Sequence, residues 1–203
     1  MVALTAAEIA RTTRGRLVSG DPARRVERWS IDSRTIVRGD LFVAVHGERF
    51  DGHAFVAAAL AAGAAGAVVT RASAPPEAGT GPAPLVIVVD DTIRALQDAA
   101  REVRRRCGAT VIAITGSAGK TTTKELTAEF LSERFSVFRN KGNLNNHIGL
   151  PLSLLGLRDR PQMAVVELGM NHAGEIRTLV GVAQPNVRVW TNVGDAHLGF
   201  FES

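Results

Sequence analysis

The segment that most constrains the fold of this chain is Thr115-Gly-Ser-Ala-Gly-Lys-Thr-Thr-Thr123. It follows the apolar run 110–115 and opens a stretch typical of a helix from Lys120 to about Phe135. Glycines let the backbone curl so that successive N–H groups face an anion, and the helix N-terminus adds its dipole. A lysine and a hydroxyl at the helix start suit a phosphate and its Mg²⁺. The segment therefore predicts a phosphate-binding loop between a buried strand and a helix.

This loop is a short form of the general phosphate-binding motif. The general pattern has a glycine five positions before Gly119, where this chain has Ile114, so the match is to Gly-x-x-Gly-Lys-Thr. A glycine-rich turn with an incidental lysine is the alternative, and the strand–loop–helix setting disfavours it. An unrelated kinase or GTPase is a second alternative, but the chain has no Asn-Lys-x-Asp segment that would read a guanine base.

The rest of the chain predicts two α/β domains. In residues 1–90 the expected elements are short, namely strands at 41–45, 67–70 and 85–90 and a helix at 53–62. In residues 91–203 they alternate more regularly, with helices at 92–106, 120–135 and 174–182 and strands at 110–115, 163–168 and 187–191. Continuous apolar strands separated by helices indicate a parallel sheet covered on both faces. Because the chain stops soon after a strand, we expect the second domain to be incomplete at its C-terminal side.

Composition narrows the class of protein. The 203 residues are 45% hydrophobic, which is enough for a buried core and excludes a wholly disordered chain. The single cysteine, Cys107, cannot form an internal disulfide, which favours a reducing compartment. No secretory signal or membrane span is evident. We therefore expect a soluble, cytoplasmic protein without membrane insertion.

The positive charge is mostly arginine, and the net charge is +4. The densest cluster comprises Arg101, Arg104, Arg105 and Arg106 on an expected helix. Nucleic-acid binding would call for interleaved aromatic residues or a recognition helix, and neither is present. We therefore expect a solvated helix face, with contacts to an anionic small molecule as the alternative, and no nucleic-acid partner.

Three further features extend the predicted phosphate site. Glu167 lies at the carboxyl end of an expected strand, where ligands of parallel sheets bind. His197 follows the next strand and is either a hydrogen-bonding loop residue or a metal ligand. The segment 140–149 is rich in asparagine, which suits oriented recognition of a small molecule but is also typical of plain turns.

Several of these motifs together resemble the Mur ligases, the amide-forming enzymes of peptidoglycan precursor synthesis. Residues 114–125 are similar to the ATP loop of that family. Residues 142–151 and 167–176 are similar to the branch that adds D-alanyl-D-alanine. Asp32-Ser-Arg34, 39–45 and 50–53 resemble the UDP-sugar-binding domain of the family; these segments are spread over essentially the whole chain.

The resemblance implies roles for individual residues. Lys120 would hold the β- and γ-phosphates of ATP and Thr121 one Mg²⁺, while Glu167 and His197 would serve a second Mg²⁺. On this basis the catalytic residues would be Lys120, Glu167 and His197, and the metal ligands Thr121, Glu167 and His197. The ATP-binding residues would be Thr115, Gly116, Ser117, Ala118, Gly119, Lys120, Thr121 and Thr122. The substrate-binding residues would be Ser33, Arg34, Phe50, Asp51, Gly52, His53, Asn145 and Asn146.

The resemblance also implies a fold and an activity. Residues 1–90 would be a small UDP-N-acetylmuramoyl-peptide-binding domain, and residues 91–203 part of a P-loop ATPase domain. The reaction would be the ATP-dependent addition of D-alanyl-D-alanine to UDP-N-acetylmuramoyl-tripeptide through an acyl phosphate. The related ligase that adds diaminopimelate or lysine is the alternative within the family. The family's carbamylated lysine and C-terminal domain would lie beyond Ser203, so we expect this chain alone to bind UDP-sugar or nucleotide without turnover.

Overall fold

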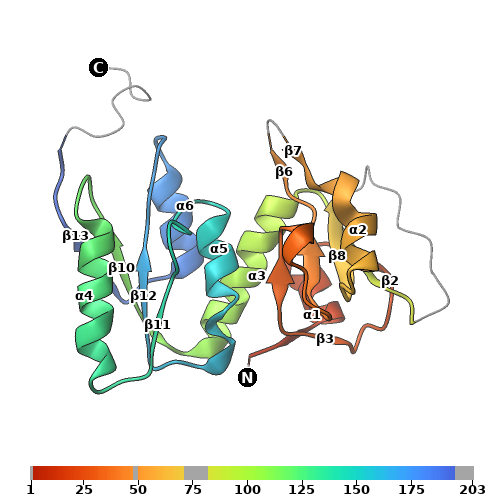
Figure 1. The fold of residues 1–203 in the computed structure, drawn as a ribbon, viewed down its shortest axis with the longest axis horizontal. Helices are drawn as coiled ribbons and strands as arrows, with labels where there is room; N and C mark the ends of the chain where they lie inside the picture. Colours follow the sequence, from red (N-terminus) through yellow and green to blue (C-terminus); the bar gives the residue numbers. More distant parts are fainter. Residues whose placement is uncertain (1, 48–49, 71–81, 195–203) are drawn as a thin grey trace. The chain divides into compact units, whose positions relative to one another are not determined.

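The computed structural model describes residues 2–47, 50–70 and 82–194 (Figure 1). The chain divides into two compact units, here called the first unit (Val2–Ala99) and the second unit (from Ala100 onward). The division falls within helix α3 (Thr92–Cys107), so this helix contributes residues to both units. The boundary expected after residue 90 lies just before the same helix.

The first unit is built on a five-stranded sheet in the order β2-β9-β8-β5-β4. Strands β9, β8, β5 and β4 are parallel to their neighbours, and β2 pairs with β9 in the antiparallel direction. The elements in chain order are β1 (Leu4–Thr5), α1 (Ala6–Thr12), β2 (Arg16–Ser19), β3 (Arg25–Val26), β4 (Trp29–Ser30), the 3-10 helix η1 (Ser33–Thr35), β5 (Leu41–Val43), β6 (His46–Gly47), β7 (Phe50–Asp51), the 3-10 helix η2 (Gly52–Phe55), α2 (Val56–Ala61), β8 (Gly66–Thr70) and β9 (Leu85–Val89).

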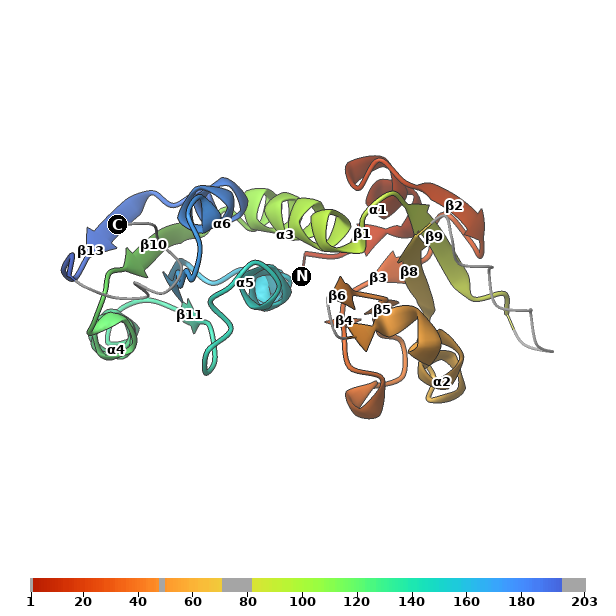
Figure 2. The same ribbon diagram turned by 90° about the horizontal axis from the view of Figure 1, so that it is seen from above.

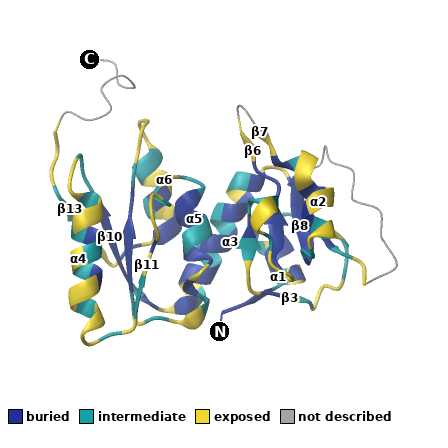
Figure 3. Cartoon of the chain, in the orientation of Figure 1, coloured by how far each residue is buried: buried dark blue, intermediate teal, exposed yellow. Residues whose placement is uncertain are grey.

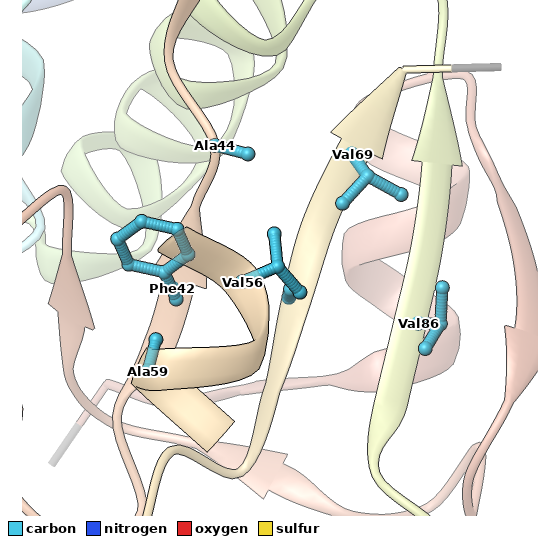
Figure 4. Packing of buried hydrophobic residues seen from close by; sticks show 7 residues of the cluster. Phe42, Ala44, Val56, Ala59, Val69 and Val86 are labelled. Atoms are coloured by element: carbon cyan, nitrogen blue, oxygen red, sulfur yellow. The ribbon is translucent and has the colours of Figure 1, made fainter. Parts of the chain in front are cut away.

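The core of the first unit forms where α2 packs on this sheet. Figure 4 shows Phe42 from β5, Val56 and Ala59 from α2, Val69 from β8 and Val86 from β9 gathered in one cluster. Each of these residues is buried. Alternate residues of a strand point to the same face, so these short apolar strands supply a continuous face for the helix. The 3-10 helices η1 and η2 contact α2, so this packed helix supports both of them.

The second unit contains a four-stranded sheet in the order β11-β12-β10-β13, and all its strands are parallel. The expectation of a parallel sheet is therefore confirmed. Its elements after α3 are β10 (Thr110–Thr115), α4 (Lys120–Ser132), β11 (Val137–Arg139), α5 (Gly149–Leu154), the 3-10 helix η3 (Leu157–Asp159), β12 (Met163–Glu167), α6 (Glu175–Ala183) and β13 (Val187–Trp190).

Helices cover both faces of this sheet. Figure 2 shows α4 on one face and α6 on the other, as expected for parallel strands that are apolar on both sides. On the α4 side, Ala128 packs with Ile112, Ile114 and Val165 of the central strands. Figure 3 shows β10 and β12 as buried, whereas the outward face of α4 is exposed. The two central strands therefore end in a fixed position, and the loops that follow them are anchored to a rigid core.

Some elements differ from the sequence expectation. The segment 53–62, expected to be one helix, is the 3-10 turn η2 followed by the short helix α2. Strand β11 and helix α5 were not expected, because three residues and six residues are too few to establish a periodicity. Among the residues that the structure describes, no helix combines the length and the apolar character needed to cross a bilayer.

The arginine cluster of α3 was expected to form a solvated face, and this was wrong for Arg104. Its guanidinium is buried and donates to the backbone oxygens of Ala183 and Gln184 and to Oδ1 of Asn186, at 2.8, 3.0 and 2.9 Å. These acceptors lie at the end of α6, where helix carbonyls lack intrahelical donors. Arg105 is exposed and pairs with Glu102. Part of the cluster therefore caps a helix rather than facing solvent.

Candidate functional site

The predicted phosphate-binding loop lies between β10 and α4, so its strand–loop–helix setting is confirmed. Gly116 has a φ of +142° and Gly119, the N-cap of α4, a φ of +77°. Residues that carry a side chain rarely adopt such backbone angles, and a Cβ on Gly116 would clash with Oγ1 of Thr191. Both glycines are therefore required by the path of the backbone.

The segment that follows β13 holds the loop from one side. The backbone N–H groups of Ser117 and Ala118 donate to O and Oδ1 of Asn192, at 3.1 and 2.9 Å. The hydroxyl of Thr191 donates to the backbone oxygen of Ala118. Thr191 and Asn192 were missed as site residues by the sequence reasoning. Their position just beyond the carboxyl end of a neighbouring parallel strand was the signal that could have found them.

Lys120 folds back over the loop. Its Nζ donates to the backbone oxygens of Gly116 and Ser117, at 2.7 and 3.4 Å. The ammonium group thus lies at the mouth of the loop, and Lys120 lines two adjacent cavities of about 490 and 300 Å³. The smaller cavity is lined by residues of the loop together with Met170, Ile176 and Trp190.

A second group of polar side chains lies at the ends of β10 and β12. The Thr121 hydroxyl donates to Oε2 of Glu167 at 2.7 Å, and Nδ2 of Asn145 donates to Oε1 of the same carboxylate at 2.7 Å. Glu167 is 3% exposed, and both of its carboxylate oxygens accept a hydrogen bond. The structure therefore brings together three residues that the sequence placed in the site, from three separate segments of the chain.

The asparagine-rich segment lines the larger cavity. Asn146 caps the start of α5, because its Oδ1 accepts from the N–H groups of Ile148 and Gly149 at 3.1 and 2.7 Å. Most side chains that line the cavity are polar, and its lining residues are Lys120, Asn143, Asn145, Asn146, His147, Gly169, Met170, Asn171, His172 and Glu175. Amide and imidazole groups of this kind can bind a polar, multiply charged molecule beside the lysine.

Ser33 and Arg34 contribute to a separate cavity in the first unit. This cavity measures about 390 Å³, and Phe42 and Phe55 form its apolar part. The Arg34 guanidinium pairs with Asp32 through two hydrogen bonds, 2.9 and 2.7 Å long. These bonds lower the pKa of Asp32 to about 2. The Arg34 side chain is 87% exposed, so its remaining donors face solvent.

Asp51, Gly52 and His53 form a turn near this cavity but are not among its lining residues. His53 Nδ1 lies 2.6 Å from Oδ1 of Asp51, and its Nε2 accepts from the N–H group of Thr70 at 3.1 Å. Both ring nitrogens are thus engaged within the chain, and the bond from Thr70 requires an unprotonated Nε2. Phe50 lies in β7, and its side chain is outside the described residues.

Comparison with known proteins identifies the family. Residues 114–203 match the model of the Mur ligase middle domain, and residues 25–104 match that of the Mur ligase family, catalytic domain. The chain belongs to the Mur ligase family. It is 40% identical over 200 residues to the UDP-N-acetylmuramoyl-tripeptide–D-alanyl-D-alanine ligase of Bacillus subtilis (strain 168), covering 98% of this chain and 43% of that protein.

Solved structures of Mur ligases agree with this assignment. The crystal structure of MurF from Acinetobacter baumannii matches with a TM-score of 0.87 and 40% identity, over 99% of this chain and 43% of that one. MurF from Thermotoga maritima in complex with ADP matches with a TM-score of 0.73 and 37% identity, over 85% of this chain and 39% of that one. The chain therefore spans less than half the length of these Mur ligases.

Thr122 and His197 were also predicted to belong to the site of this Mur ligase chain. Thr122 is exposed on the first turn of α4. His197 lies outside the described residues, so its expected place beside Glu167 stays a prediction. Within residues 2–47, 50–70 and 82–194, no three His, Cys, Asp or Glu side chains converge in a way that could hold a metal ion by themselves.

Two buried polar residues of this Mur ligase chain were not predicted individually from the sequence, although Asn140 begins the asparagine-rich segment 140–149. Lys124 and Asn140 are both 0% exposed, and Nζ of Lys124 donates to the backbone oxygen of Asn140 at 2.9 Å. Lys124 shares the inward face of α4 with Ala128, four positions later. A lysine in the register of a core position was the signal that could have found it.

Proposed function

We propose that this chain provides the nucleotide-binding and UDP-sugar-binding parts of a ligase that adds D-alanyl-D-alanine to UDP-N-acetylmuramoyl-tripeptide. In this proposal residues 1–90 bind the UDP-N-acetylmuramoyl peptide, and residues 91–203 bind ATP. The observation that carries the proposal is the meeting of Thr121, Glu167 and Asn145 beside Lys120. The names of the relatives from Bacillus subtilis and Acinetobacter baumannii support the choice of reaction.

The second unit has the donors that a triphosphate requires. Backbone N–H groups at the start of a helix lack intrahelical acceptors, and those of α4 follow the loop directly. Lys120 presently donates to carbonyl oxygens of the loop, and we propose that it turns to the β- and γ-phosphates. A charged donor bonds more strongly to phosphate than to a neutral carbonyl. A similar protein from Thermotoga maritima was solved in complex with ADP, which supports nucleotide binding here.

Glu167 at the end of β12 and Thr121 in the first turn of α4 suit a magnesium ion. Mg²⁺ prefers oxygen ligands and is commonly held by one or two carboxylates together with substrate phosphates and water. Glu167 supplies a carboxylate and Thr121 a hydroxyl 2.7 Å from it, so the donor set fits this ion. We propose that these two residues hold Mg²⁺, with His197 as a further ligand. The ion would neutralise the charge of the phosphates.

The proposed reaction is the formation of an amide in two steps. The substrate carboxylate takes the γ-phosphoryl group of ATP and releases ADP; the D-alanyl-D-alanine amine then attacks the acyl phosphate, and phosphate and a proton leave. Carboxylate and triphosphate repel one another, so the role of the chain is to offset this repulsion and to align the reactants. Lys120 offsets the repulsion, while Asn145 and Asn146 align the reacting groups within the larger cavity.

In the first unit we propose that Arg34 contacts the diphosphate. A guanidinium group can bond two phosphate oxygens at once, and that of Arg34 is already held in place by two hydrogen bonds to Asp32. Ser33 adds a hydroxyl at the same cavity, and Phe42 and Phe55 offer apolar surface. Asp51, Gly52 and His53 are proposed to shape the turn that leads into this cavity.

The length of the chain relative to its relatives favours the variant of the proposal in which the chain binds its ligands without turnover. It spans 43% of the Bacillus subtilis relative, so a binding part without turnover is the form we propose for the 203-residue chain alone. The amine substrate would then be held by the remainder of such a ligase. Loss of this approximation of reactants removes about 7–11 kcal/mol of barrier lowering.

Two measurements test the proposal. Calorimetric titration of the chain with ATP, UDP and GTP in the presence of Mg²⁺ should show binding of ATP and UDP, with GTP much weaker. Phosphate release should be undetectable with the chain alone, even when ATP, UDP-N-acetylmuramoyl-tripeptide and D-alanyl-D-alanine are all present. Absence of ATP binding contradicts the assignment of the second unit, whereas turnover dependent on D-alanyl-D-alanine contradicts the variant without turnover.

A further inference from the structure

A buried lysine of the second unit has no part in the proposed chemistry. Lys124 lies on α4 one turn after Lys120, and its side chain is fully buried. Removing an ammonium group from water is costly unless the group is paired and hydrogen-bonded. A neutral residue of similar length would pack in this position without that cost. The lysine therefore calls for an explanation from its partners.

The ammonium group of Lys124 has two partners, Asn140 and Glu125. Nζ donates to the backbone oxygen of Asn140 at 2.9 Å and lies 3.0 Å from Oε1 of Glu125. The side chain of Glu125 is 45% exposed, whereas Asn140 is fully buried. The bond to Asn140 joins two fully buried residues, so a donor at the end of a long buried side chain is needed to make it. It ties the helix after the phosphate-binding loop to the residue that directly follows β11.

Asn140 in turn joins two parts of the site through its side-chain amide. Its Oδ1 accepts from the backbone N–H group of Glu167 at 3.0 Å, and its Nδ2 donates to the backbone oxygen of Leu144 at 3.0 Å. Glu167 carries the site carboxylate, and Leu144 directly precedes Asn145. One amide therefore fixes the backbone of Glu167 and of the residue directly before Asn145.

The result is a closed set of hydrogen bonds around Glu167. Asn140 holds the backbone at residues 167 and 144, and Asn145 Nδ2 closes the set by donating to Glu167 Oε1 at 2.7 Å. Asn145 is further fixed because its backbone oxygen accepts from Gly169 N at 2.9 Å. A small displacement of Asn140 would move the backbone that carries the carboxylate and the backbone just before Asn145 together, because both are bonded to the same side chain.

From this arrangement we propose that Asn140, held in place by Lys124, is a positioning residue for the cation-binding group of the site. Asn140 touches neither nucleotide nor cation in this proposal; it sets where the carboxylate of Glu167 and the amide of Asn145 stand relative to Thr121. Residues that orient metal ligands from behind influence metal affinity strongly. The inference rests on the proposed function, since a nucleotide with its Mg²⁺ is what would respond to this placement.

The test measures the effect of Mg²⁺ on ADP binding by the 203-residue chain. Calorimetry gives the ADP affinity with saturating Mg²⁺ and with EDTA, and the ratio of the two affinities is the quantity compared. The test variants are Lys124→Met, which keeps length and packing, and Asn140→Ala. The matched controls are Lys141→Ala, beside Asn140 but exposed, and Glu125→Gln, which weakens the ion pairs of Glu125 with Lys124 and Arg139 but keeps the bond from Lys124 to Asn140.

The expected result is a fall in this ratio of about tenfold in both test variants, the lower end of the loss seen when a partner of a metal ligand is removed. The ADP affinity in EDTA should stay close to that of the unmodified chain, and both controls should keep the full ratio. A merely structural role would instead lower the melting temperature and both affinities together, with the ratio unchanged.

Three outcomes overturn the inference. An unchanged ratio in a folded test variant removes the positioning role but leaves the proposed function intact. Failure of both test variants to fold assigns Lys124 and Asn140 a structural role only. Absence of ADP binding by the unmodified chain overturns the inference and the proposed nucleotide site together, so failure of the two is distinguishable.

Discussion

The hydroxyl of Thr121 and the carboxylate of Glu167 are joined by a hydrogen bond of 2.7 Å, although 46 positions separate them in the chain. Thr121 lies in the first turn of the helix after the phosphate-binding loop, and Glu167 is the last residue of the neighbouring parallel strand. Neighbouring parallel strands end at the same edge of a sheet, so the β10–β12 pairing is what brings the two together. This contact links the phosphate-binding loop to the proposed cation site.

Replacing Thr121 tests that link. Thr121→Val keeps the shape of the side chain but leaves Oε2 of Glu167 without its donor. We expect the affinity for Mg²⁺·ATP to fall by about tenfold, which corresponds to the loss of one hydrogen bond to a charged group. Thr121→Ser, which keeps the hydroxyl, should bind as the unmodified chain does. Calorimetry distinguishes the two, and equal binding by the valine variant contradicts the link.

Replacing Lys120 tests the phosphate-binding loop itself. Lys120→Ala should abolish detectable binding of Mg²⁺·ATP, because the ammonium group at the loop mouth is lost. The free energy of unfolding should change by no more than about 0.5 kcal/mol, since the side chain is not part of the core. Lys141→Ala is the control at an exposed lysine. Normal ATP affinity together with an unchanged melting temperature would remove Lys120 from the site.

Arg34 is the test of the cavity in the first unit. Arg34→Ala should weaken UDP binding by about tenfold, the effect of losing a charge-assisted bond to phosphate. Arg38→Ala removes an exposed arginine that lines a different cavity and should leave UDP binding unchanged. Titration with UDP followed by NMR provides the measurement. Shifts that cluster away from Ser33 and Arg34 would indicate that Arg34 serves only its surface pair with Asp32.

Arg104 allows a prediction about stability that is independent of function. Arg104→Met removes buried bonds to Ala183, Gln184 and Asn186 and takes the Arg104 donor away from the backbone oxygens of Ala183 and Gln184 at the end of α6. We expect a loss of about 2–4 kcal/mol in the free energy of unfolding. Arg105→Met, on the same helix but exposed, should cost no more than about 1 kcal/mol. Urea denaturation compares the two, and equal losses would contradict the capping role.

Glu102 makes the stability depend on acid pH. Hydrogen bonds from Arg105 and Arg106 outweigh burial and lower its pKa from 4.5 to about 2. Because the folded-state pKa lies below the unfolded value, this stabilisation is present above pH 4.5 and is lost as the pH falls toward 2. Between neutral pH and pH 3 we expect Glu102 to account for a loss of about 1–2 kcal/mol. Urea denaturation of Glu102→Gln should show this part of the pH dependence removed.

Much of the second unit could be predicted from short stretches of sequence. The run 110–115 is apolar at nearly every position, and the limits of β10 agree with it. The glycines and Lys120 that follow have few uses other than a tight loop before a helix, and that setting was confirmed. In the first unit, the limits of β8 and β9 also lie close to those expected. These features are local, because the residues that specify them are neighbours in the chain.

Tertiary structure decided the rest. Arg104 and Arg105 are adjacent arginines on one helix, yet one is buried and the other exposed, because only Arg104 reaches the carbonyl groups at the end of α6. Asn140 lies in a segment whose composition is typical of turns, and its role depends on the backbone of Glu167, 27 positions away. A hydrogen-bonding group has the same chemistry wherever it lies in the sequence; its partner, and therefore its function, is set by which strands pair and in which register.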